Sequence, residues 1–100
     1  MKRARFLTLA RRELLAHTAY YDLQDAGLGS RFAGAVEVAV SRALAFPLSG
    51  SPAYKNTRRV FVRDFPFSVI YRPDEQGILV FALAHHARSP EHWQLRVQEP

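Results

Sequence analysis

A chain of 100 residues, 48% of them hydrophobic, has room for a single domain with one core. It contains no cysteine, which excludes disulfides, zinc–thiolate sites and thiol catalysis. The formal net charge is +5, and 12 of the 14 basic residues are arginines, the side chain suited to planar contacts with phosphates and carboxylates. A small basic domain of this kind indicates either a nucleic-acid surface or an acidic protein partner.

We expect no segment of this sequence to direct the chain to a membrane. The basic N-terminus is followed by Arg11, Arg12 and Glu13, which interrupt any apolar stretch that could serve as a signal peptide. No apolar run approaches the roughly 20 residues that span a bilayer. We therefore expect one cytoplasmic domain over residues 1–100, with no cofactor and no part in the membrane.

The N-terminal half predicts a strand followed by a helical hairpin. Residues 3–8 alternate charged and apolar side chains, and the spacing becomes helical from about residue 9. Gly27 is expected to end the first helix, and a second helix is expected from about Leu28 until Pro47 stops it. Alanines along both apolar stripes would let the two helices approach closely.

The C-terminal half predicts a sheet. After a loop over 47–57, β-prone runs at about 58–63, 66–72 and 78–85 are joined by turns so short that they form an antiparallel meander. The third run is apolar on both faces, which predicts a central strand flanked on its other side by the first strand of the chain. The tail, 90–97, could add a short helix. The expected fold is α+β, in the order β-α-α-β-β-β(-α), with a small, mostly antiparallel four-stranded sheet packed on the hairpin.

This order of elements, with several short motifs, resembles the RelE/ParE superfamily over essentially the whole chain. The motifs are Leu28-Gly29 with Arg31-Phe32, Phe46-Pro47, Arg58-Arg59, Phe65-Pro66-Phe67 with Val69-Ile70-Tyr71, and Ala84-His85 followed by Arg88, Pro90 and Trp93. Members of that superfamily are toxins of bacterial type II toxin–antitoxin and plasmid stabilisation systems. Some of them cut mRNA on the ribosome, and others inhibit DNA gyrase.

Strand alternation predicts one basic face on the sheet, which the resemblance makes the functional face. The residues expected on this concave surface are Lys55, Arg59, Arg63, Arg72, His85 and Arg88. The candidate contacts to a target or an antitoxin are Arg59, Arg63, Arg72, His85, Arg88 and Trp93. The simpler alternatives are that the arginines only solvate the sheet and that Trp93 covers its end. Arg11, Arg12, Arg42 and Arg96 are expected to lie solvated on helix exteriors.

A ribonuclease would need a base for the 2′-hydroxyl, an acid for the leaving oxygen and cations for the phosphate. The candidates for those roles are Lys55, Arg63, Arg72, His85 and Arg88. This set is incomplete beside family ribonucleases, because no glutamate lies between Glu37 and Glu75 and no tyrosine follows Tyr71. The histidines fit no standard metal motif, and His17 is expected to be a packing residue.

The resemblance therefore favours a ParE-like toxin that inhibits DNA gyrase by binding, with no catalytic residue assigned. A RelE-like, ribosome-dependent mRNA endonuclease is the alternative, and an inactive remnant that only binds an antitoxin is a third. All three imply a cognate antitoxin in a hetero-oligomer, with an acidic and apolar segment that folds on the toxin. His85 and His86 are expected to point to opposite faces of the last strand, and the sequence leaves open which of them is functional.

Overall fold

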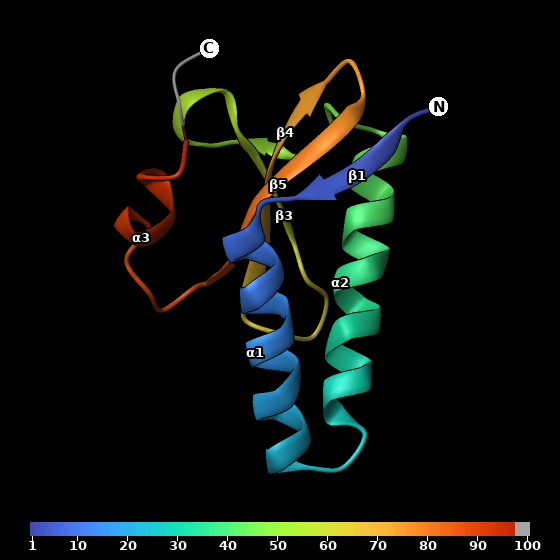
Figure 1. The fold of residues 1–100 in the computed structure, drawn as a ribbon, viewed down its shortest axis with the longest axis vertical. Coiled ribbons are helices and arrows are strands. Elements are labelled where there is room, and N and C mark those ends of the chain that lie inside the picture. Colours follow the sequence, from blue (N-terminus) through green and yellow to red (C-terminus); the bar gives the residue numbers. More distant parts are fainter. Residues whose placement is uncertain (98–100) are drawn as a thin grey trace.

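The computed structural model describes residues 1–97 and packs a helical hairpin on one face of a five-stranded sheet (Figure 1). The hairpin consists of α1 (Thr8–Gln24) and α2 (Leu28–Ala45), and a short helix, α3 (Glu91–Gln94), follows the sheet. The sheet order is β1-β5-β4-β3-β2. The strands are β1 (Arg3–Phe6), β2 (Ser51–Pro52), β3 (Arg58–Phe61), β4 (Phe67–Asp74) and β5 (Gly77–His85). The predicted α+β class is confirmed. Within residues 1–97, no helix has both the length and the apolar character needed to cross a membrane.

The first strand lies where the sequence predicted it, beside the last strand of the meander. β1 runs parallel to β5, with Arg3 opposite Gly77. The two backbones are so close there that a β-carbon on Gly77 would lie 2.2 Å from the Arg3 carbonyl oxygen, and Gly77 has a φ of +131°. Both conditions require glycine. Arg5 also forms an ion pair with Asp74 at the end of β4, which ties the edge strand to the next hairpin.

The hairpin buries the stripe of α2 that helical spacing predicted. Gly27 joins the helices with a φ of +89°, and the Asp22 carboxylate accepts a hydrogen bond of 2.8 Å from the Gly29 N–H. The buried residues of α2 are Gly29, Phe32, Val36, Ala39, Val40 and Ala43. They form one core with inward-facing residues of β4 and β5, among them Val69 and Val80.

The sheet has one strand more than the four that the sequence predicted. β2 lies inside the expected loop and pairs antiparallel with the start of β3. Lys55 and Asn56 form the turn between them with φ of +50° and +62°, the geometry of a type I′ hairpin. Because that turn usually carries asparagine–glycine or aspartate–glycine, Lys-Asn gives a weak signal in the sequence. β3 also ends at Phe61, earlier than predicted, because the chain turns through Asp64 with a φ of +69°.

A core tyrosine fixes the path from α2 to β2. The fully buried Tyr71 donates a hydrogen bond of 2.8 Å to the Pro47 carbonyl and accepts one of 3.2 Å from the Gly50 N–H. Burial raises the pKa of Tyr71, so the hydroxyl keeps the proton that it donates. A β-carbon on Gly50 would lie 2.5 Å from this hydroxyl, so the loop can pass only with glycine at that position.

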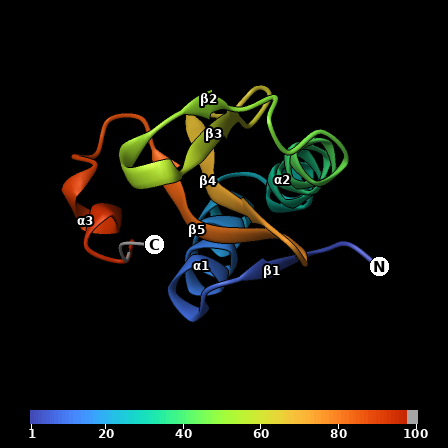
Figure 2. The ribbon, with the colours of Figure 1, turned by 90° about the horizontal axis from the view of Figure 1, so that it is seen from above.

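The second face of the sheet is covered by the C-terminal segment. α3 lies on the side of the sheet opposite α2 (Figure 2). Trp93, which is 5% exposed, and Val97 form a second core cluster with Ile70, Phe81 and Ala82. A register shift after Ile70 leaves Phe81 as an extra residue in β5, and both Phe81 and the next residue, Ala82, belong to this second cluster. The packing role predicted for Trp93 is therefore observed.

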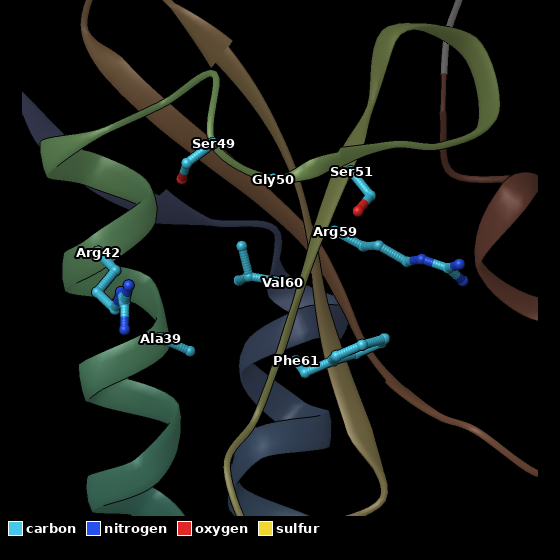
Figure 3. Close-up of a pocket in the computed structure, with 8 residues that line it drawn as sticks. All are labelled: Ala39, Arg42, Ser49, Gly50, Ser51, Arg59, Val60 and Phe61. Carbon is cyan, nitrogen blue, oxygen red and sulfur yellow. The ribbon is translucent and has the colours of Figure 1, made fainter.

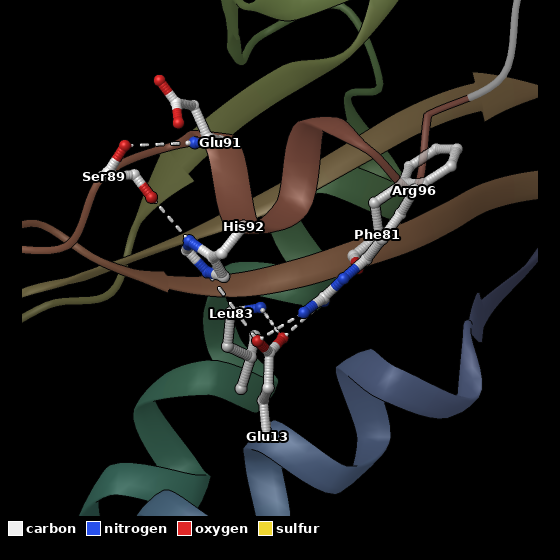
Figure 4. Close-up of polar contacts among 7 residues, drawn as sticks. All are labelled: Glu13, Phe81, Leu83, Ser89, Glu91, His92 and Arg96. Atoms are coloured by element: carbon white, nitrogen blue, oxygen red, sulfur yellow. Dashed lines mark hydrogen bonds and ion pairs between the residues drawn. The ribbon is translucent and has the colours of Figure 1, made fainter.

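A carboxylate on α1 holds this segment in place (Figure 4). Glu13 accepts hydrogen bonds of 2.9 Å from both terminal nitrogens of Arg96 and one of 3.2 Å from the Leu83 N–H. The Arg96 and Glu13 side chains are only 13% and 14% exposed, and the His92 ring lies 3.8 Å from the same carboxylate. The expectation that Arg96 is solvated was wrong. Its partner lies 83 residues earlier in the chain, so local spacing could not indicate the pair.

Candidate functional site

A groove beside α3 on the second face of the sheet holds part of the predicted basic surface. We call it the outer groove, and it encloses about 350 Å³. The residues that line it are Arg59, Phe61, Ser68, Ile70, Ala84, His85, His86, Arg88, Pro90 and Trp93. Three of the six residues expected on the basic surface, Arg59, His85 and Arg88, are brought together here. Trp93 is also present, but as a buried wall.

An aromatic side chain of the outer groove, that of Phe61, is 68% exposed. The Arg59 guanidinium lies 6.0 Å from the centre of its ring, and the His86 ring packs edge-on against it at 5.4 Å. An exposed aromatic ring beside a guanidinium offers a partner both an apolar contact and a charge contact. The groove is therefore suited to binding an acidic and apolar surface.

His85 and His86 point to opposite faces, as the alternation of a strand predicts. The His86 Nε2 atom lies 2.9 Å from the hydroxyl of Ser68, which is itself buried. His85 is opposite Phe67 in the β4–β5 ladder and contacts its ring at 5.0 Å on the helix side of the sheet. The His85 Nδ1 atom accepts a hydrogen bond of 3.0 Å from the backbone N–H two residues later. Both histidines line the outer groove, and the contacts of His86, to Ser68 and Phe61, are with other residues of the groove.

Arg72 and Lys55 lie together at the β2–β3 turn, and neither lines the outer groove. The Arg72 guanidinium lies 5.3 Å from the centre of the Phe81 ring and donates a hydrogen bond to the Lys55 carbonyl. The Lys55 ammonium lies 5.3 Å from the ring of Tyr54, which in turn contacts Trp93. These contacts brace the turn against the second face of the sheet. The predicted basic surface is therefore not continuous: Lys55 and Arg72 lie at the β2–β3 turn, apart from the residues that line the outer groove.

Arg63 lies in a third place, along the open edge of β3. Two hollows of about 300 and 410 Å³ run between α2 and β3 and share Ala39, Arg42 and Phe61. Figure 3 shows the residues that line the smaller one. We call them together the α2–β3 trough. The residues that line it are Arg31, Ala35, Val38, Ala39, Arg42, Ser49, Gly50, Ser51, Arg59, Val60, Phe61, Arg63, Asp64 and Phe65. Arg63 therefore does not line the outer groove together with His85 and Arg88.

The geometry agrees with a comparison against known protein families. The family model described as the ParE toxin of the type II toxin–antitoxin system parDE matches residues 4–90. The chain belongs to the ParE toxin family. It also resembles a solved structure described as the chromosomal ParDE TA system from P. aeruginosa, with a TM-score of 0.74 and 17% sequence identity. That match covers 85% of this chain and 96% of the other, and at this identity it shows a shared fold. No curated protein sequence matches.

One histidine of the toxin lies half-buried against its first core. His17 on α1 packs against the rings of Phe67 at 4.6 Å and Phe32 at 6.3 Å, as the packing role predicted for it requires. Burial lowers the pKa of His17 below its ordinary value; Glu13 opposes that shift, and the nearby His85 and Arg88 add to it. No group of three His, Asp or Glu side chains within residues 1–97 is arranged to hold a metal ion.

The sequence analysis missed the α2–β3 trough of this toxin. Arg31, Ala35, Val38 and Arg42 follow one another at spacings of four, three and four residues and form a second stripe on α2 beside its buried one. Arg42 was expected to be merely solvated. This second stripe can be recognised in the sequence after the buried residues of α2 have been assigned to the core. The open edge of β3 opposite it cannot be recognised, because it depends on where β2 ends.

Proposed function

We propose that this toxin inhibits DNA gyrase by binding it and trapping its cleaved DNA complex, and that a cognate antitoxin neutralises it. One observation carries the choice of a binding mechanism over catalysis. The ribonuclease candidates lie in three separate places: Lys55 and Arg72 at the β2–β3 turn, Arg63 in the α2–β3 trough, and His85 with Arg88 at the outer groove.

Cleavage of RNA requires its acid and base within hydrogen-bond reach of one phosphodiester. The Lys55 side chain rests over Tyr54, and its turn is held by Arg72. Arg63 lines the α2–β3 trough and is not among the residues that line the groove of Arg88. A binding mechanism requires no such convergence. It needs accessible cations and apolar groups, which Arg59, Phe61, His86 and Arg88 provide.

The test is a pair of assays with purified toxin and purified gyrase, one for DNA supercoiling and one for accumulation of cleaved DNA. We expect the toxin to block supercoiling and to increase cleaved DNA. The double variant Arg59→Ala/Arg88→Ala should lose this effect, whereas Arg11→Ala/Arg12→Ala on exposed α1 positions should keep it. Gyrase that is unaffected by the unmodified toxin would refute the proposal.

A second function, ribosome-dependent mRNA cleavage, is favoured by one feature: a basic groove that contains the Ser68–His86 pair. Pulse-labelling of DNA and protein synthesis minutes after induction of the toxin alone separates the two functions. An early fall in DNA synthesis supports gyrase, and an immediate collapse of translation supports mRNA cleavage. Toxicity that survives both Lys55→Ala and His85→Ala argues against the ribonuclease. The absence of any growth defect would indicate an inactive, antitoxin-binding remnant.

The proposed place of action is the cytoplasm, where gyrase and DNA are found. The partner that neutralises the toxin is proposed to be a small protein with an acidic and apolar segment, in a toxin–antitoxin hetero-oligomer. The net charge of +5 and the exposed Phe61 and Val38 support this chemistry for the partner.

A further inference from the structure

The first helix carries a row of exposed residues on the side turned away from the core. α1 contacts the core through Ala10, Leu14, His17 and Tyr21. The centre of the exposed row lies about a third of a turn or more from that of the core row. We call this row the α1 stripe, and it consists of Leu9, Arg12, Ala16, Tyr20 and Leu23.

The α1 stripe is apolar apart from Arg12. Leu9 and Leu23 are 47% and 85% exposed, so no element of residues 1–97 covers them. The outer row of α2 consists instead of Ser30, Gly34, Glu37 and Ser41. A helix that is apolar on several sides is normally buried on those sides. The α1 stripe is therefore suited to contact with another molecule.

The α1 stripe has the same spacing in both directions. Its residues follow one another at intervals of three, four, four and three, so Ala16 is its centre. In an antiparallel pair with a two-fold axis at Ala16, Leu9 of one helix lies opposite Leu23 of the other. Arg12 then lies opposite Tyr20, and a guanidinium is attracted to the face of such a ring. Contact between two copies requires this self-complementarity, whereas contact with a different partner does not.

The charges of α1 also favour an antiparallel pair. Arg11 and Arg12 lie in its first half, and Asp22 and Asp25 lie at its C-terminal end. Glu13 is already paired within the chain. Cations near the N-terminus of a helix and carboxylates near its C-terminus are unfavourable for that helix alone. An antiparallel neighbour brings each pair towards charges of opposite sign, whereas a parallel neighbour would bring like charges together.

A hollow at the start of α1 has room for a side chain from the other copy. It encloses about 560 Å³ and is lined by Leu7, Thr8, Leu9, His92, Leu95 and Arg96. Leu95 is 91% exposed. The antiparallel pair places Leu23 of the other copy over Leu9 and therefore beside this hollow. The contact would then bury Leu95 in addition to the α1 stripe.

We propose that two copies of this toxin associate through the α1 stripe, with their α1 helices antiparallel about a two-fold axis at Ala16. Ala16 lets the helices approach closely at the axis, and Leu23 of each copy packs on Leu9 and Leu95 of the other. None of the residues that line the outer groove belongs to α1. The pair therefore presents two outer grooves, and the inference is independent of which target they bind.

The size of this surface predicts a weak dimer. α1 has 17 residues, so its face is about 25 Å long and 10–12 Å wide. Such an area is small beside the interfaces of stable complexes, so we expect a dissociation constant on the order of 10–100 μM. The toxin alone should change from monomer to dimer over this range of concentration.

The first experiment is sedimentation equilibrium of the full toxin, without any partner, from about 5 to 500 μM. Ala16→Glu places two carboxylates at the two-fold axis and should weaken the dimer by at least about tenfold. Ser41→Glu adds the same charge to the outer row of α2 and should change the dissociation constant by less than about twofold. Circular dichroism checks that both variants are folded.

The second experiment uses the absence of cysteine from the chain. Ala16→Cys should form a disulfide between two copies under mild oxidation, because the two-fold axis places the two sulfurs side by side. Residues 12 and 20 are about 12 Å apart along the helix, so Arg12→Cys and Tyr20→Cys should each cross-link poorly to themselves. An equal mixture of the two should give at least about tenfold more mixed disulfide than either symmetric one, measured by mass spectrometry.

Several results would overturn the proposal. A toxin that stays monomeric at 500 μM, about five times the weakest dissociation constant expected, has no such dimer. Equal effects of Ala16→Glu and Ser41→Glu would place the contact elsewhere, and a preference for the symmetric disulfides would mean parallel helices. A monomeric toxin that floats with phosphatidylglycerol vesicles, and no longer does so as Ala16→Glu, would assign the α1 stripe to a lipid surface.

Discussion

At the scale of single residues, the Tyr71 hydroxyl decides whether the chain can pass from α2 to β2. It satisfies the Pro47 carbonyl and the Gly50 N–H at a site closed to water. Tyr71→Phe leaves both groups without this partner, so we expect the free energy of unfolding to fall by about 1–3 kcal/mol. Urea denaturation measures the loss. Tyr20→Phe, on a side chain that is 55% exposed, is the matched control, and an equal loss there would contradict this role for Tyr71.

His17 makes stability depend on pH in a defined direction. Burial lowers its pKa in the folded protein, so above about pH 6.5 both folded and unfolded chains hold it neutral and it has no effect. Below that pH the unfolded chain binds a proton that the folded chain resists, so stability falls until the lowered pKa is passed. In His17→Phe this part of the pH dependence should vanish, whereas His86→Gln should retain it. Unfolding midpoints measured across this range test the slope, and an unchanged slope in His17→Phe would refute the assignment.

At the scale of elements, the β2–β3 turn is strained at Lys55. A left-handed backbone costs a residue with a β-carbon about 1–2 kcal/mol, and glycine avoids that cost at the expense of about 0.5–1 kcal/mol of chain entropy. We therefore expect Lys55→Gly to stabilise the protein by on the order of 0.5–1 kcal/mol. Lys55→Ala removes the same ammonium but keeps the β-carbon and should give no gain. If both variants change the unfolding midpoint alike, the side chain rather than the backbone is responsible.

The cover formed by α3 depends on the Glu13–Arg96 pair. Glu13→Ala removes a carboxylate that accepts three hydrogen bonds. For each hydrogen bond to the charged Arg96 group that is lost, the free energy of unfolding should fall by at most about 1.5–3 kcal/mol. We also expect α3 to lose its protection from hydrogen exchange early. Because an unpaired, partly buried charge is what destabilises, the double variant Glu13→Leu/Arg96→Met should regain much of the loss. Double-mutant cycles measure the coupling. A double variant as unstable as the sum of the single variants would show that the two residues act independently.

At the scale of the whole molecule, the sequence sufficed for the order of elements and for the place of β1. Period-two and helical spacings, with Gly27 and Pro47 as stops, determine which segments can bury an apolar face. The sequence did not suffice to predict the candidate site. The location of Arg63 depends on the turn at Asp64, and the grouping of Arg72 with Lys55 depends on a Lys-Asn turn. The Glu13–Arg96 pair and the trough arise from contacts between distant segments, for which local pattern has no signal.

The net charge of the whole chain makes a last prediction about how fast the antitoxin binds. A charge of +5 attracts an acidic partner over distances comparable to the Debye length, about 10 Å at 0.1 M salt. The association rate should therefore fall by about tenfold or more between roughly 0.05 and 0.5 M salt, with a smaller change in the dissociation rate. Stopped-flow mixing of toxin and antitoxin measures both rates.

Two variants with the same net charge separate attraction at long range from contact. Arg31→Gln/Arg42→Gln and Arg11→Gln/Arg12→Gln each remove two charges, so both should slow association at low salt by similar factors. Only the first pair lines the α2–β3 trough, so only the first should also speed dissociation. Dissociation that quickens equally in both variants would mean that contact with the antitoxin extends over α1.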